Sequence, residues 1–310
     1  MPGGGSLPIP VPALDGADLG TNTHPLPTAG SGITPVFELD RVSYRYQGRF
    51  PALIDVSLSI QPGQKVAILG ANGSGKSTLL KMLAGLYFSA SGSIRAFGQE
   101  LSEARLADDA TNWAFRRRVG FVFQDPDVQL FSATVWDDVA FGPLQLGLPR
   151  SELAERVRRT LDRLGIEHLA ERVPYGLSGG EKKKVALATA LVMEPEVLLL
   201  DEPTAALDPR SERALVELIV DWNASGHTVI TATHDLDLVA ELADRAIVFG
   251  EGKTLVRDGP PGEILGDHEF LAAHNLAHSH AHRHATAGEV AVHAHPHLHH
   301  ELPGHTSPAS

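Results

Sequence analysis

The chain has 310 residues, of which 43% are hydrophobic and 21% are charged, so it is long enough for one large domain or two modest ones with a hydrophobic core. It contains no cysteine, which excludes disulfides and thiolate metal sites and fits a reducing compartment. The formal net charge of -12 argues against a nucleic-acid-binding protein, which would usually carry a basic surface.

Composition divides the chain into three segments. Residues 1–35 are rich in proline, glycine and small polar residues, and we expect this extension to be disordered. Residues 36–266 hold nearly all of the patterned sequence, and residues 267–310 form a tail crowded with histidine, which we expect to be flexible. No apolar run approaches the ~18–20 residues of a membrane span, and no secretion signal is recognisable. We therefore expect a cytoplasmic protein whose membrane spans, if needed, belong to another polypeptide.

Short apolar runs alternate with helical patterns through the middle segment. The expected strands are, in chain order, Pro35–Tyr46, Ala52–Ile60, Lys65–Leu69, Val197–Leu200, Thr228–Thr233, Arg245–Gly250 and Lys253–Arg257. A helix is expected from Lys76 to Leu86, and residues 112–177 are mostly helical in pattern. Buried strands that alternate with helices predict an α/β fold with a parallel sheet.

A glycine-rich turn separates the third strand from the first helix. It matches the pattern G-x-x-x-x-G-K-[ST] in full, through Gly70, Ala71, Asn72, Gly73, Ser74, Gly75, Lys76 and Ser77, and Thr78 follows in the helix. The glycines let successive backbone N–H groups point at phosphate oxygens, and the helix start favours an anion. We expect Lys76 to reach the β- and γ-phosphates of ATP and Ser77 to bind Mg²⁺. A chance match is the alternative, and the strand–loop–helix context weakens it.

Two carboxylates follow a buried strand later in the chain. Val197–Leu200 runs into Asp201 and Glu202, which we expect at the carboxyl edge of the sheet, where ligands of open α/β folds bind. Asp201 would hold Mg²⁺, and Glu202 would act as general base on the attacking water. His234 follows a strand that should lie beside this one, which would bring its ring near the γ-phosphate. The alternative is a set of solvated polar residues at strand ends.

Between these centres lies the sequence Leu177-Ser178-Gly179-Gly180-Glu181. Ser178 and Glu181 have the spacing of a capping box before an apolar helix, Val185–Met193. The same helix start, with Ser178 and two glycines, is also suited to bind an anion.

The order of these motifs resembles the ABC ATPase family over essentially all of residues 36–266, and Leu177–Glu181 corresponds to that family's LSGG signature, with Glu181 in place of the usual glutamine. The resemblance implies a P-loop NTPase (RecA-like) core with an antiparallel β subdomain and a helical subdomain at about residues 112–177. It also implies a homodimer or a heterodimer that sandwiches two ATP molecules, with Ser178, Gly179 and Gly180 of one subunit facing the ATP of the other. The further roles it implies are adenine stacking by Tyr46 and Q-loop, D-loop and switch functions for Gln124, Asp208 and His234.

The segments Phe123–Phe131, Asp138–Pro143 and Leu177–Lys184 resemble the energy-coupling-factor importers of vitamins, cobalt or nickel. That resemblance implies a membrane coupling subunit in contact with Asp125–Leu130, a substrate-binding membrane subunit, and a location at the cytoplasmic face of the membrane. The alternative for Asp125–Leu130 is a plain linker into the helical subdomain.

Twelve of the 16 histidines lie at or after His268. Neutral imidazole is a common ligand of Ni²⁺, Co²⁺, Cu²⁺ and Zn²⁺, so we interpret the tail as a low-specificity metal buffer, with a solvated tail of no role as the alternative. The candidate ligands are His278, His280, His282, His284, His293, His295, His297, His299 and His300.

Together these patterns predict an ATP- and Mg²⁺-dependent ATPase that energises nickel or cobalt import. The first alternative is the ATPase of a vitamin importer. The second is a metal-buffering protein or a soluble ABC ATPase without a transport role.

Overall fold

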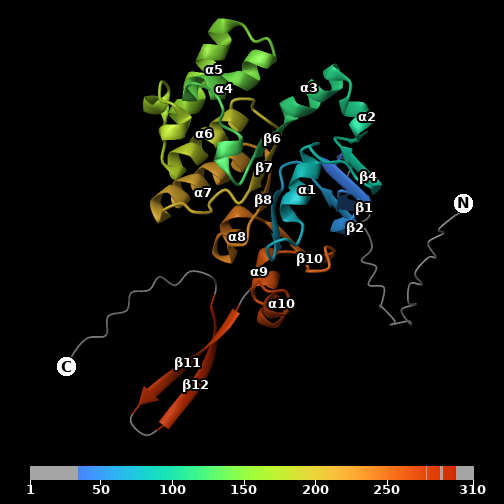
Figure 1. Cartoon of the computed structure of the whole chain (residues 1–310), viewed down its shortest axis with the longest axis vertical. Helices are drawn as coiled ribbons and strands as arrows, with labels where there is room; N and C mark the ends of the chain where they lie inside the picture. Colours follow the sequence, from blue (N-terminus) through green and yellow to red (C-terminus); the bar gives the residue numbers. More distant parts are fainter. Residues whose placement is uncertain (1–33, 277, 287–288, 298–310) are drawn as a thin grey trace, which may run out of the picture. The chain divides into compact units, whose positions relative to one another are not determined.

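The computed structural model describes residues 34–276 in full, and the backbone alone of residues 278–286 and 289–297 (Figure 1). The disorder expected for residues 1–35 therefore concerns a segment almost wholly outside the described residues.

A six-stranded sheet forms the centre of the domain. Its strands, in spatial order, are β10 (Leu255–Gly259), β9 (Arg245–Phe249), β3 (Lys65–Gly70), β8 (Thr228–Ala232), β7 (Val197–Asp201) and β6 (Val119–Val122). All neighbours are parallel except the β9–β10 pair. The predicted α/β fold is confirmed, and β8 lies directly beside β7 as expected.

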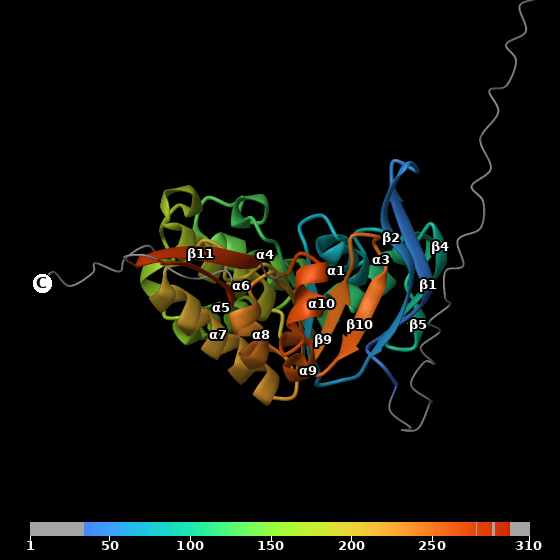
Figure 2. The same ribbon diagram turned by 90° about the horizontal axis from the view of Figure 1, so that it is seen from below.

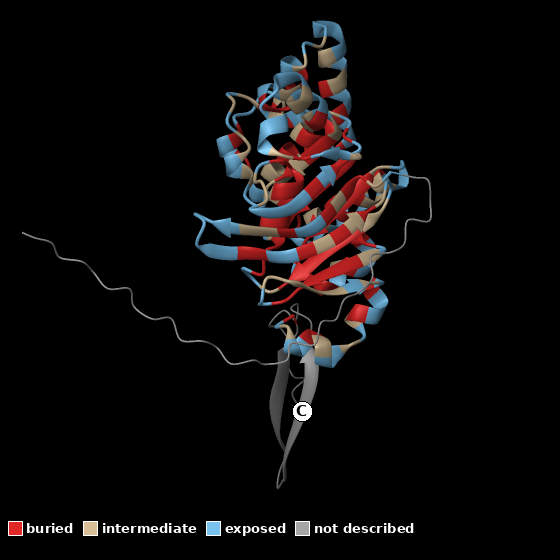
Figure 3. Cartoon of the chain, turned by 90° about the vertical axis from the view of Figure 1, so that its right-hand side faces the viewer, coloured by how far each residue is buried: buried red, intermediate tan, exposed pale blue. Residues whose placement is uncertain are grey.

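Alternate residues of the central strands face opposite sides of the sheet, and both sides are buried, as in other parallel sheets. On one side, Val66 and Ile68 pack with helix α1 (Lys76–Leu83). On the other, Ala67 and Leu69 pack with α8 (Leu236–Leu242), α9 (Pro261–Leu265) and α10 (His268–Ala273). Farther along that second side, β7 packs under α6 (Gly179–Leu191) and α7 (Pro209–Ala224). Figure 3 shows the buried residues along these strands, and Figure 2 shows α9 and α10 beside β9 and β10.

A second, antiparallel sheet covers the α1 side of the central sheet. It comprises β1 (Phe37–Tyr46), β2 (Phe50–Ile60), β4 (Ser91–Ala96) and β5 (Gln99–Glu100), in the order β2-β1-β4-β5. The β1–β2 turn has Gln47 and Gly48 at positive φ and falls in the gap between the first two expected strands. The helices α2 (Glu103–Leu106) and α3 (Asp109–Arg118) lead from this sheet to β6.

The helical part of the domain contains α4 (Val135–Gln145), α5 (Arg150–Arg163) and α6, with short 3₁₀ turns at Pro126–Val128, Glu167–Leu169 and Pro174–Gly176. It begins later than the predicted residue 112, because α3 and strand β6 occupy residues 109–122. Helix α1 ends at Leu83 and not at Leu86, since Gly85 takes the left-handed conformation that terminates helices. No helix in the described part of the chain is long and apolar enough to cross a membrane.

The folded domain continues past the predicted boundary at residue 266. Helix α10 follows, and Leu271 and Leu276 are buried against the second side of the sheet. Farther on, β11 (His278–Thr286) and β12 (Glu289–His297) form an antiparallel pair in which His280 opposes His295. This regular backbone differs from the flexible tail that we expected. Histidine alternates with other residues here, and an alternation with a period of two is compatible with a β-strand. The predicted metal ligands there lie outside the residues whose side chains are described.

Candidate active site

Four neighbouring strands bring the residues predicted to bind phosphate and Mg²⁺ and to act on water to one edge of the central sheet. Strand β3 leads into the glycine-rich loop, β8 into His234, β7 into Asp201 and Glu202, and β6 into Gln124. Because these strands are parallel and adjacent, their carboxyl ends open on the same side. The sheet therefore collects residues that are far apart in the sequence around one cavity.

The loop after β3 leaves no room for side chains at two of its glycines. A Cβ on Gly70 would lie 2.3 Å from Oγ of Ser74, and one on Gly75 would lie 2.4 Å from the carbonyl oxygen of Ala52. Both glycines also have positive φ, at 153° and 114°. Gly75 is the N-cap of α1, so the loop delivers the N-terminus of that helix to the cavity. This backbone has the form expected of the predicted phosphate cradle.

Lys76 is buried, and its ammonium is held by the loop itself. Nζ donates hydrogen bonds to the carbonyl oxygens of Gly70 at 2.8 Å and Ala71 at 3.4 Å, and lies 4.0 Å from Oε1 of Glu202. Burial lowers the pKa of Lys76, while the charges of Glu202 and Asp201 act in the opposite direction. An anionic phosphate is the ligand that would best compensate a buried ammonium in this position.

Ser77 and Asp201 lie in contact at the end of β7. The Ser77 hydroxyl donates to Oδ1 of Asp201 at 2.9 Å, and Asp201 is buried. Burial raises the pKa of Asp201, although the hydrogen bond from Ser77 opposes that rise. A hydroxyl beside a buried carboxylate is an oxygen donor set suited to Mg²⁺, so the residues present fit the predicted ion.

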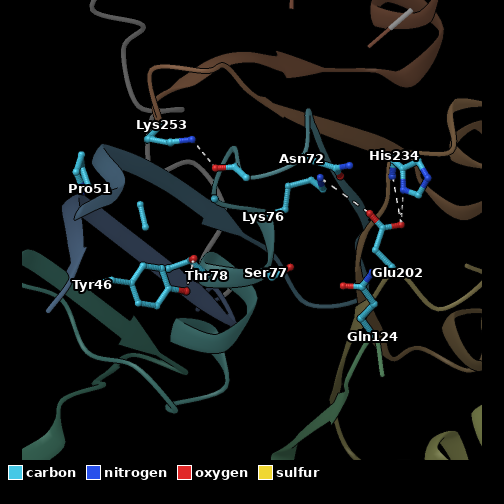
Figure 4. Close-up of a pocket in the computed structure, with 13 residues that line it drawn as sticks. Tyr46, Pro51, Asn72, Lys76, Ser77, Thr78, Gln124, Glu202, His234 and Lys253 are labelled. Carbon is cyan, nitrogen blue, oxygen red and sulfur yellow. Dashed lines mark hydrogen bonds and ion pairs between the residues drawn. The ribbon is translucent and has the colours of Figure 1, made fainter. Parts of the chain in front are cut away.

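Glu202 connects the loop lysine to the histidine after β8. Oε2 of Glu202 lies 2.9 Å from Nδ1 of His234 and accepts a longer bond from the His234 backbone N–H. The Glu202 side chain is buried, while that of His234 is half exposed. Figure 4 shows the carboxylate between the Lys76 ammonium and the imidazole. The structure thus brings together the two residues predicted to act on the attacking water and the γ-phosphate.

A cavity of about 500 Å³ is lined by Lys76, Ser77, Glu202 and His234, together with Tyr46, Thr78 and Gln124 (Figure 4). Asp201 lies behind Ser77 and does not line it. The Tyr46 hydroxyl and Oγ1 of Thr78 are 2.9 Å apart, and the ring packs edge-to-face on Tyr44 at 5.2 Å. The aromatic ring is thereby fixed at one end of the cavity, where a planar base can stack.

One basic residue of this cavity was not predicted from the sequence. Lys253, in the turn between β9 and β10, lines the cavity, and its Nζ donates to the carbonyl oxygen of Gly73. A turn was implied between the expected strands Arg245–Gly250 and Lys253–Arg257, but no local pattern connected Lys253 to a loop 180 residues earlier.

Comparisons with known proteins agree with this geometry. A family model described as ABC transporter matches residues 53–205. The nickel import ATP-binding protein NikO of Rhodobacter capsulatus is 52% identical over 247 residues, which cover 79% of this chain and 96% of that protein. The chain belongs to the ABC transporter ATP-binding family.

Other relatives of this ABC ATPase carry related names. The energy-coupling factor transporter ATP-binding protein EcfA of Methanothermobacter thermautotrophicus is 40% identical, over 78% of this chain and 76% of that protein. Among solved structures, CbiO1 of Clostridium perfringens, described as part of the transporter complex CbiONQ, is 39% identical with a TM-score of 0.67, over 78% of this chain and 95% of that one. A dimeric ATP-binding cassette bound to ADP and Pi is 29% identical, also with a TM-score of 0.67, over 73% of this chain and 98% of that one.

The signature residues of the ABC ATPase do not line the candidate ATP cavity of their own chain. Ser178, Gly179, Gly180 and Asp208 line a separate surface pocket. The capping box is present: Ser178 accepts from the Glu181 backbone, and the Glu181 carboxylate accepts from the Ser178 N–H at 2.8 Å. The hydrogen bonds that the Glu181 carboxylate accepts from the Ser178 N–H and hydroxyl lower the pKa of Glu181. Within one chain, then, the two halves of the predicted ATP-binding surface are separate.

The segment after Gln124 is joined to helix α6, which begins at the signature, by hydrogen bonds and an ion pair. The partly buried amide of Gln129 donates to the Ala186 carbonyl at 2.9 Å and to Thr189 Oγ1 at 2.7 Å. Lys182 of α6 forms an ion pair with Asp127 at 2.6 Å. In the same part of the chain, residues 128–144, four apolar side chains are exposed: Val128, Phe131, Phe141 and Leu144.

Proposed function

We propose that this ATPase energises the import of nickel or cobalt through an energy-coupling-factor-type transporter. The observation that carries the proposal is the 52% identity to a nickel import ATP-binding protein over almost the whole of that protein. The likeness to CbiO1 of a CbiONQ complex supports the same class of importer. The family membership, the ATPase activity and the need for ATP and Mg²⁺ do not depend on the metal assignment.

In the proposed mechanism, Glu202 accepts a proton from the water that attacks the γ-phosphate. Its contact with His234 orients the carboxylate, and we assign His234 to stabilise the negative charge that develops on the phosphate. Lys76 would hold the β- and γ-phosphates, and Gln124 would line the path of the attacking water. Ser77 and Asp201 would hold Mg²⁺, which supplies charge neutralisation on the phosphates.

The remaining ATP contacts would come from Tyr46, which would stack on the adenine, and from a second subunit. Because Ser178, Gly179, Gly180 and Asp208 lie in a pocket apart from the phosphate cradle, one chain alone cannot apply them to its own ATP. We therefore propose a dimer, with an identical or a related subunit, in which each signature helix faces the partner's nucleotide. The dimeric solved cassette is consistent with this arrangement.

Coupling to the membrane would use the segment Asp125–Leu130 and the exposed apolar patch formed by Val128, Phe131, Phe141 and Leu144. The Phe131 and Phe141 rings pack edge-to-face 5.1 Å apart, and both remain accessible to a partner. Exposed aromatic residues in a group are typical of protein interfaces. We propose that a membrane coupling subunit docks here, which would hold this ATPase at the cytoplasmic face of the membrane.

The alternatives differ in substrate or in partners. The ATPase of a vitamin importer is the first alternative. It is favoured by the relative named as an energy-coupling factor ATPase, because that name does not specify a metal. A metal-buffering protein or a soluble ABC ATPase is the second. The histidines from His278 to His300 remain proposed low-specificity ligands of Ni²⁺ or Co²⁺, on the chemistry of imidazole alone.

The experiment that tests the proposal is a purification of the tagged Glu202→Gln chain from native membranes in the presence of ATP, with co-purified chains identified by mass spectrometry. We expect polytopic membrane subunits, and the identity of the substrate-binding chain separates a metal importer from a vitamin importer. Recovery of soluble partners alone would contradict the transport role. The wild-type chain purified without ATP is the matched control.

A further inference from the structure

Lys183 connects the signature helix to the backbone that carries Glu202. It lies in α6, five residues after Ser178, and is partly buried. Its Nζ donates to the carbonyl oxygen of Glu202 at 2.9 Å and to that of Pro203 at 3.1 Å. Charge-assisted hydrogen bonds of this kind are stronger than neutral ones. One ammonium therefore fixes two successive peptide groups directly after β7.

The backbone that Lys183 holds is in an unusual conformation. Glu202 has a φ of 48°, in the left-handed region that residues other than glycine rarely adopt. It also precedes a proline, which further restricts its backbone. Residues in such conformations store strain that the surrounding structure must offset. Apart from Lys183, the backbone contacts of Glu202 are its N–H bond to the Ala232 carbonyl at 2.9 Å and a bond from the Ala205 N–H at 3.3 Å.

The three consecutive lysines of α6 differ in their contacts. Lys182 forms an ion pair with Asp127, and Lys183 donates to the two carbonyls. Within the described residues, Lys184 makes neither kind of contact. Lys183 does not line the ATP cavity. Burial lowers the pKa of Lys183, while the charge of Glu202 acts in the opposite direction.

We propose that Lys183 is a positioning residue for Glu202: its bonds to the Glu202 and Pro203 carbonyls hold the strained peptide so that the carboxylate stays between Lys76 and His234. The same bonds join the signature helix to the catalytic carboxylate within one subunit. A shift of α6 thereby alters the position of the general base. This inference rests on the proposed role of Glu202 as that base.

The test uses the full-length chain with Mg²⁺ and ATP, and compares Lys183→Met with Lys183→Arg. We expect Lys183→Met to lower kcat at least tenfold, because the peptide that carries Glu202 loses both bonds. KM and the Kd for ATP should stay within about twofold of wild type, because Lys183 does not touch the candidate nucleotide site. Lys183→Arg keeps the charge and can donate to both carbonyls, so kcat should recover to within about threefold of wild type. Unchanged kcat in Lys183→Met would overturn the proposal, as would a parallel loss of ATP binding, which would indicate a purely structural role.

A double-variant comparison separates this inference from the role of Glu202. If Lys183 acts through the carboxylate, Lys183→Met should not further slow the residual hydrolysis of Glu202→Gln. Rate losses that multiply in Lys183→Met/Glu202→Gln would refute the positioning role and leave the assignment of Glu202 intact. Near-normal hydrolysis by Glu202→Gln alone would instead refute the base assignment.

Discussion

Nδ1 of His234 lies 2.9 Å from Oε2 of Glu202, while the other oxygen of the same carboxylate lies 4.0 Å from Nζ of Lys76. One buried carboxylate thus faces both the ammonium of the phosphate cradle and the imidazole after β8. A water held by this carboxylate would be close to the phosphate that we propose Lys76 binds. The proposed chemistry of hydrolysis depends on this arrangement.

Replacement of Glu202 by glutamine should block hydrolysis but retain ATP binding. The amide would keep the size of the side chain but could not accept the proton of the attacking water, and loss of a general base typically costs about 10²–10⁴ in rate. We expect phosphate release to fall at least about 100-fold, with the Kd for ATP unchanged or lower. Glu103→Gln, on the exposed side of α2, is the matched control. Near-normal turnover would rule out the base assignment.

Replacement of Lys76 by alanine should weaken ATP binding, turnover or both. The change removes a buried ammonium whose bonds to phosphate would be charge-assisted, each worth about 1.5–3 kcal/mol. We expect the Kd for ATP to rise at least about tenfold in equilibrium binding. Lys65→Ala is the control, because Lys65 lies at the other end of β3 and pairs with the exposed Asp244. Equal affinity of the Lys76→Ala and wild-type proteins would contradict the phosphate role.

The capping box at the start of α6 should make stability depend on pH. The pKa of Glu181 is lowered by its bonds to Ser178, so it contributes stability above its unfolded pKa, and this contribution is lost as the pH falls through the lower, folded value. Glu181→Gln keeps the shape of the cap without the charge. We expect its Tm at pH 7 to be about 1–2 °C below wild type, from roughly 0.5 kcal/mol of capping energy. The difference should shrink as the pH falls below the ordinary glutamate pKa of about 4.3. A difference that grows with acidity would contradict the sign.

Dimerisation should require both ATP and the signature residues. We expect Glu202→Gln to elute as a dimer with ATP and as a smaller species without it. Ser178→Arg in the same background places a bulky cation where the partner's phosphate should lie, and we expect the ATP-induced dimer to be lost while each chain still binds ATP. An ATP-dependent dimer that survives Ser178→Arg would show that this surface does not face the partner nucleotide.

The exposed apolar patch should be needed for membrane association and not for ATP binding. Phe131 is 69% exposed, so Phe131→Ser should change folding stability little. We expect less of the variant in the membrane fraction of cells that contain the transporter, with an unchanged Kd for ATP. Trp113→Ser, on α3 away from the patch, controls for the loss of a surface aromatic residue. Equal recovery of both variants in membranes would argue against docking at this patch.

Local patterns were sufficient to predict the central features of the site. The glycine-rich loop, the Asp201–Glu202 pair and the capping box at Ser178 each occupy a few consecutive residues whose chemistry is specific. The proximity of His234 to the acidic pair could also be predicted, because a buried strand before each of them implies neighbouring strand ends.

The features that the sequence did not reveal depend on contacts between distant residues. Strand β6 has only four residues and lies between two helical segments, so no length or alternation distinguished it. Lys253 reaches the glycine-rich loop, and Lys183 reaches the carbonyl of Glu202, only after the chain has folded. In the sequence, both are ordinary lysines of a turn and a helix. The positive φ of Glu202 likewise has no local signal, since it is imposed by the tertiary structure.

The central claim is that ATP hydrolysis by this chain drives the uptake of nickel or cobalt. Its most direct test measures the uptake of radioactive Ni²⁺, Co²⁺ and labelled vitamins in cells whose only copy of the chain is either wild type or Glu202→Gln. We predict that uptake of nickel or cobalt falls to background in the Glu202→Gln cells while vitamin uptake is unchanged. Loss of vitamin uptake with unchanged uptake of both metals would contradict the claim and favour the vitamin importer.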